Sequence, residues 1–177
     1  MLAWTIDSSF IGVLVLMLLP RAAARAARII ALLTAVVGCG VAFAGAMQQA
    51  NPGEVTTIVR IPWVPSLGAN YFLAADGISL VLVVLTGLAA IAGILFSWNI
   101  EKRTKEFFAF YLALIGSVYG VFLSFDVLLL FVFYELTIIP KYFLIARWGI
   151  AKILFFIAIT IFVIFILLAL FAGQVIF

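Results

Sequence analysis

The chain has 177 residues, of which 68% are hydrophobic and 10% are charged, and its mean hydropathy is +1.41. A water-soluble domain of this length could not bury so much apolar surface, so the composition excludes a soluble protein and indicates an integral membrane protein. The formal net charge of +3 does not point to nucleic acid as a partner, because the ten Lys and Arg residues lie in small groups between apolar runs.

Ligands for the common redox and metal centres are scarce in the sequence. It contains one cysteine, Cys39, and no histidine. Haem ligation by histidine, iron–sulfur ligation by several cysteines and zinc sites therefore lack their ligands. We expect no redox site and no metal site within this chain, and we interpret Cys39 as a small residue packed between helices.

The first apolar run, at about 3–19, is long enough to resemble a signal peptide. A signal peptide has its positive charges before the apolar stretch. Here the order is reversed, because Asp7 comes before most of the run and Arg21, Arg25 and Arg28 follow it. We therefore predict an uncleaved membrane helix.

Six apolar runs can cross about 30 Å of hydrocarbon at about 1.5 Å per residue. They predict an all-α membrane protein with a single transmembrane domain over residues 1–177 and spans at about 3–19, 29–47, 73–98, 107–125, 126–145 and 153–172. The fourth and fifth spans almost touch, which requires a tight turn around Ser124, Phe125 and Asp126.

Basic residues follow the first, third and fifth spans, as Arg21, Arg25, Arg28, Lys102, Arg103, Lys105, Arg147 and Lys152. On the other side, the connections contain Arg60 as their one basic residue. The positive-inside rule thus predicts that both termini lie on the non-cytoplasmic side.

The outer connection, at about 48–72, is rich in β-branched residues, and we predict an extended hairpin there. The loop from Glu101 to Glu106 reads as solvated, with a docking surface for a soluble partner as the alternative. Aromatic residues near the predicted span ends are expected to form interfacial belts, namely Trp63, Tyr71, Trp98 and Trp148.

Glu135 is the principal candidate for function, because it lies about nine residues into the fifth span. An ionisable group at mid-membrane costs about 2.5–3.5 kcal/mol on insertion scales, which the apolar neighbours offset. Such a carboxylate is expected to face the protein interior or a water file and to handle protons. The alternative is a structural carboxylate bonded to a neighbouring hydroxyl.

Pro140 and Lys141 follow Glu135 on the same predicted helix. Proline has no amide hydrogen and is expected to bend the helix, either to admit water near Glu135 or as a packing device. Lys141 is about 240° further round the helix than Glu135, so the two should not pair directly. Lys141 either extends its amine to the membrane surface or relays protons there.

Two aspartates are predicted to cap helices, Asp126 before the fifth span and Asp76 before the third. Four glycines are expected to allow close helix contacts, namely Gly87, Gly93, Gly116 and Gly120.

Taken in order, several of these motifs closely resemble one family. They are Asp76-Gly77-Ile78-Ser79-Leu80, Lys105-Glu106-Phe107-Phe108, Gly120-Val121-Phe122 followed by Asp126, Phe133-Tyr134-Glu135, Ile139-Pro140 and Trp148-Gly149. Over roughly residues 1–150 the chain resembles the N-terminal part of chain M, or chain 4, of the proton-pumping NADH:quinone oxidoreductase, respiratory complex I.

The resemblance implies an enzyme subunit and the first part of an antiporter-like bundle of about fourteen helices, in which Glu135 pairs with a lysine on a later helix. NADH, flavin, iron–sulfur clusters and quinone would bind in partner subunits, and the partners would be other membrane subunits, including antiporter-like chains, in a lipid bilayer. The implied location is the bacterial inner membrane.

The chain also departs from the family pattern. Tyr134 replaces a usual tryptophan, Lys141 replaces a common methionine, and the sequence ends at Phe177 after one further predicted span. We therefore expect a split, truncated or shortened subunit, in which Lys152 is too near the membrane boundary to replace the missing lysine. The alternatives are the membrane chain of a multisubunit cation/proton antiporter and a non-transporting scaffold.

Overall fold

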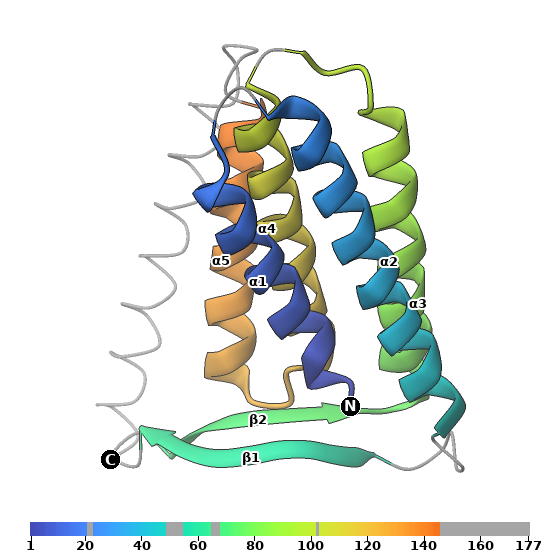
Figure 1. Cartoon of the computed structure of the whole chain (residues 1–177). Coiled ribbons are helices and arrows are strands. Elements are labelled where there is room, and N and C mark those ends of the chain that lie inside the picture. The colour runs from blue at the N-terminus through green and yellow to red at the C-terminus, as the bar shows by residue number, and fades with distance from the viewer. Residues whose placement is uncertain (21–22, 49–54, 65–67, 102, 146–177) are drawn as a thin grey trace.

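The computed structural model describes residues 1–20, 23–48, 55–64, 68–101 and 103–145. Within these ranges the chain forms five helices and one two-stranded sheet. The helices stand side by side and the strands lie across one end of the bundle (Figure 1). The sixth predicted span, at 153–172, lies outside the described residues.

The helices are α1 (Ala3–Leu18), α2 (Ala24–Gln48), α3 (Gly77–Phe96), α4 (Thr104–Leu123) and α5 (Val127–Ile145). By length and composition, α2 to α5 are each able to cross a membrane, while α1 is a shorter apolar helix of 16 residues. At about 1.5 Å per residue, α1 is about 24 Å long. The chain is thus an integral membrane protein of the predicted helical class.

Three helices begin a few residues away from the start of the predicted membrane span. Helix α2 begins at Ala24 rather than 29, and α4 begins at Thr104 rather than 107. Helix α3 begins at Gly77 rather than 73, because residues 73–75 belong to a strand. Apolar runs mark the part of a helix that lies in hydrocarbon, whereas the helix itself ends where its backbone hydrogen bonds end.

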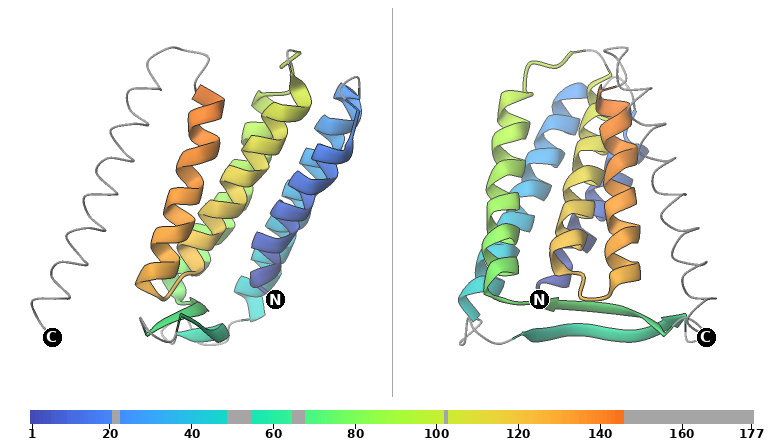
Figure 2. Two further views of the ribbon diagram at one scale, coloured as in Figure 1. Left: turned by 90° about the vertical axis from the view of Figure 1, so that its left-hand side faces the viewer. Right: turned by 180° about the vertical axis from the view of Figure 1, so that it is seen from behind.

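The predicted hairpin is present, as strands β1 (Thr56–Val64) and β2 (Ala69–Ala75). They pair antiparallel, from Thr56 opposite Ala75 to Val64 opposite Ala69. Figure 2 shows from two further sides that the hairpin lies across the end of the bundle where the N-terminus lies. The backbone N–H of Phe125 donates to the carbonyl of Phe72 at 2.9 Å, which fastens β2 to the short turn between α4 and α5.

Helix α4 is the centre of the bundle, because it contacts α1, α2, α3 and α5. Its side chains Phe108, Leu112, Tyr119 and Leu123 are almost fully buried. Glycines bring the helices close together, and at Gly120 an added Cβ would overlap the ring of Phe133 on α5. The other three glycines predicted to allow close contacts also face a neighbouring helix, with Gly87 against Cys39, Gly93 against Tyr111 and Gly116 against Ser9.

Candidate functional site

Asp126 fixes the start of α5. Its Oδ1 accepts hydrogen bonds from the N–H groups of Leu128 (2.9 Å) and Leu129 (3.3 Å), as a helix cap does. Its Oδ2 accepts from the N–H of Asn70 on β2 at 2.9 Å. These three donors, and Asn70 most strongly, hold the pKa of Asp126 below its usual range. One carboxylate thus joins the helix to the hairpin.

Asp76 caps α3 in the same way. Its Oδ1 accepts from the N–H of Ser79 at 2.7 Å, and this hydrogen bond lowers the pKa of Asp76. The cap predicted at each aspartate is therefore present. The sequence pattern did not show that Asp126 also bonds Asn70, because the two residues are far apart along the chain.

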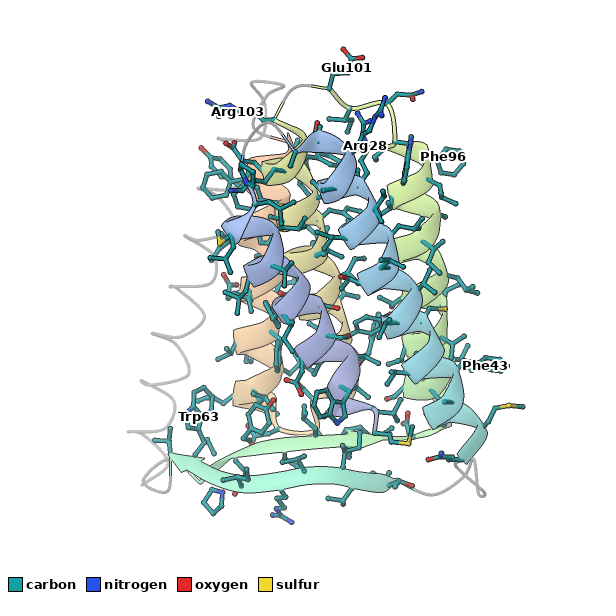
Figure 3. All side chains as sticks on the ribbon, viewed as in Figure 1. Arg28, Phe43, Trp63, Phe96, Glu101 and Arg103 are labelled. Carbon is teal, nitrogen blue, oxygen red and sulfur yellow. The ribbon has the colours of Figure 1, made fainter. Side chains whose placement is uncertain are left out.

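At the opposite end of the bundle, Lys105 fixes the end of α1. Its Nζ donates to the carbonyls of Met17 (2.8 Å) and Leu19 (2.6 Å), which are left free where the helix stops. The interpretation of 101–106 as a solvated loop is wrong at this position and at Thr104, which begins α4 and is buried. It holds for Glu101 and Arg103, which are exposed at this end (Figure 3).

Glu135 lies on the side of α5 that faces away from α4. The inner face of α5, which packs on the bundle, consists of the buried residues Leu129, Phe133, Thr137 and Pro140. Glu135 is about 200° round the helix from Phe133. It belongs to the outer face, which we define as Leu128, Phe131, Glu135 and Tyr142, and its side chain is half-buried.

No hydrogen bond or ion pair of Glu135 occurs among the described residues. The nearby hydroxyl of Thr137 donates to the carbonyl of Tyr134 at 2.6 Å. The alternative of a structural carboxylate bonded to a hydroxyl thus lacks a partner within the described part of the chain. A cationic partner, if Glu135 has one, must come from beyond it.

Pro140 and Lys141 occupy opposite environments. Pro140 is buried within α5, which continues to Ile145. Lys141 is exposed and forms no ion pair with Glu135, in agreement with their positions on the helix. The relay role of Lys141 stays a prediction. Across the described ranges, no group of three or more His, Cys, Asp or Glu side chains is placed to hold a metal ion.

Together, the fold and Glu135 define the class of the protein: a polytopic helical membrane protein with a carboxylate within one of its spans. A comparison with known proteins shows which sequences this chain resembles. The chain resembles NADH-quinone oxidoreductase subunit M from Escherichia coli K12, with 42% identity over 103 residues, which are 58% of this chain and 20% of the relative. No family model matches the chain.

Two further relatives resemble the chain to a similar degree. Subunit M from Pseudomonas aeruginosa is 44% identical over 97 residues, which are 54% of this chain and 19% of the relative. Chain 4 1 of the NAD(P)H-quinone oxidoreductase from Synechococcus elongatus is 45% identical over 92 residues, or 52% and 17% of the two chains. The matched part is thus about a fifth of the length of these relatives.

A solved structure shares the fold. A chain of respiratory complex I from Thermus thermophilus, solved with bound NADH, has a TM-score of 0.65 over 81% of this chain and 28% of that chain, at 23% identity. The helical arrangement of Figure 1 is therefore also found in a chain of a respiratory complex I.

Proposed function

We propose that the chain is part of the membrane arm of a proton-pumping NADH:quinone oxidoreductase and contributes to proton translocation. The observation that carries the proposal is the identity of 42–45% to subunit M and chain 4 proteins over about half of the chain. The likeness of fold to a chain of respiratory complex I supports it independently.

Glu135 is the group that we assign to proton transfer. It lies within an apolar helix, it is half-buried, and it forms no ion pair within the described residues. A carboxylate in this setting can take up and release a proton when a charge approaches or leaves. Its position on the outer face of α5 supports a partner group on a further helix of the complex rather than on α1 to α4.

NADH, flavin, iron–sulfur clusters and quinone would bind in other subunits, so that redox chemistry would happen outside this chain.

The basic residues support a cytoplasmic location for one end of the bundle. Arg28 and Arg103 lie at the end opposite the hairpin, which carries Trp63 (Figure 3). With the positive-inside rule, this arrangement favours the hairpin and the N-terminus on the non-cytoplasmic side. The bacterial origin of the relatives supports the inner membrane as the location.

The test is the variant Glu135→Gln in the assembled, membrane-embedded complex. We expect proton pumping per NADH oxidised to fall while the subunit content of the purified complex stays unchanged, because glutamine keeps the size and polarity but cannot ionise. The matched control is Glu101→Gln, which removes a carboxylate from an exposed loop. Normal pumping in the Glu135 variant would remove the functional role of this residue, and failure to copurify with other oxidoreductase subunits would remove the proposed complex.

A further inference from the structure

One face of α1 carries a carboxylate among large apolar side chains. We call it the Asp7 face and define it as the residues Trp4, Asp7, Ile11, Leu14 and Leu18, which follow one another at intervals of three or four. All five side chains are exposed, while the other side of α1 packs on α2 and α4. Asp7 forms no hydrogen bond or ion pair among the described residues.

Asp7 lies near the start of α1, at the hairpin end of the bundle (Figure 1). Burial raises the pKa of the Tyr71 phenol on β2, and the nearby charge of Asp7 raises it further. Trp4 is 61% exposed, and an exposed tryptophan prefers the level of the lipid headgroups. Asp7 is about 4.5 Å deeper than Trp4 along the helix, where headgroups meet hydrocarbon.

The apolar surface of α1 is short. From Asp7 to Leu18 its exposed face spans about 17 Å, whereas the exposed residues of α3 from Ile78 to Phe96 span about 27 Å. A bilayer adapts to a short apolar surface by local thinning, which brings its headgroups inward. A lipid headgroup beside α1 thus reaches the level of Asp7.

We propose that the Asp7 face binds phosphatidylethanolamine, with the primary ammonium at Asp7 and Trp4 and an acyl chain along the three apolar residues that follow. A primary ammonium donates hydrogen bonds to a carboxylate, and the face of an indole ring attracts a cation. An anionic headgroup fits less well, because the Asp7 charge repels it and the Arg60 guanidinium is engaged over the ring of Phe72 at 5.1 Å.

Lipid fits this face better than another protein helix does. Helices that pack closely in membranes do so over small residues such as glycine, alanine and serine. The Asp7 face contains none of these, whereas the buried residues of α1 include Ser9 and Gly12. The inference rests on the surface of α1 and not on the proposed function.

The full chain in liposomes tests the site with photoactivatable phosphatidylethanolamine and phosphatidylglycerol, each with the reactive group at the start of one acyl chain. Mass spectrometry of the labelled peptides compares α1 with α3. We expect phosphatidylethanolamine to label α1 about threefold more than phosphatidylglycerol does, a modest factor because exposed ion pairs are weak. Asp7→Asn should abolish this preference. The control Glu101→Gln should keep it, since Glu101 is an exposed carboxylate at the opposite end of the bundle.

Equal labelling of α1 by the two lipids in the unaltered chain would overturn the proposal, as would an unchanged preference in Asp7→Asn. If that variant does not fold, the unaltered chain still decides the question. Membranes that contain the chain with its natural partners give a second decision. Labelling of α1 by phosphatidylethanolamine there would support the site, and labelling by neither lipid would show that protein covers the Asp7 face and would overturn it.

Discussion

The two faces of α5 show two different uses of one membrane helix. The inner face meets α4 through buried side chains, and Phe133 lies directly over Gly120. On the outer face, the half-buried Glu135 has no ion pair within the described residues. The inner face thus holds the helix in the bundle, while the outer face carries the carboxylate on the side away from α4. In the proposed function, a change in the protonation of Glu135 would therefore leave the packing on α4 undisturbed.

The largest stability effect should come from the inner face. We expect Phe133→Ala to destabilise the bundle by about 2–3 kcal/mol, because it leaves a cavity over Gly120; the value is below that of soluble cores, since lipid is itself apolar. Its control on the same helix is Ile139→Ala, at a residue that is 46% exposed. Thermal unfolding in detergent measures both, and equal losses would contradict the difference between the faces.

Gly120→Ala tests the same contact from α4. The added methyl group would overlap the Phe133 ring, and overpacking of this kind costs about 1–3 kcal/mol. Gly40→Ala is the matched control, because its methyl group would meet open space. If the two variants unfold at the same temperature, α5 does not pack on α4 as described.

The Asp126 cap joins α5 to the hairpin and should have a smaller effect. Asp126→Ala removes an acceptor for three backbone N–H groups, and we expect a loss of about 1–2 kcal/mol. Asp126→Asn keeps an oxygen at the cap and should lose less. Hydrogen exchange of the Asn70 amide reports directly on the link, and unchanged protection of this amide in Asp126→Ala would contradict it.

Acid should weaken the same end of the bundle slightly. The hydrogen bonds from Asn70 and Ser79 lower the folded-state pKa values of Asp126 and Asp76. A carboxyl with a lowered pKa contributes stability above its unfolded pKa of about 3.9 and loses it as the pH falls through the folded value. We expect unfolding temperatures to drop below about pH 4, with a shallower drop in Asp126→Asn. An identical pH profile for that variant would exclude a contribution from Asp126.

The sequence predicts those features that depend on composition and on neighbours along the chain. Apolar runs locate all five described helices, and the aspartates at 76 and 126 mark caps because a cap bonds amides two or three residues ahead. The hairpin follows from its β-branched residues. Glu135 stands out because few charged residues occur in a span.

Contacts between distant segments were not predictable in this way. Three hydrogen bonds join segments that only folding brings together. They link Lys105 to the end of α1, Asp126 to Asn70, and Arg28 to the carbonyl of Ile100. The face on which Glu135 lies also depends on which side of α5 packs on α4. Helix α5 has apolar residues on every side, so its sequence pattern does not indicate which face is buried.

The central claim, that the outer face of α5 holds Glu135 within the protein assembly, is tested most directly by spin-label accessibility. Cys39 is first replaced by alanine, and a spin label is then attached at Glu135→Cys and, as the exposed reference, at Val127→Cys, since Val127 is 72% exposed. In the assembled complex in lipid, we expect the label at 135 to be shielded from both oxygen dissolved in the bilayer and a water-soluble nickel chelate. Full access of either quencher, equal to that at position 127, would place the carboxylate in lipid or bulk water and contradict its role in proton transfer.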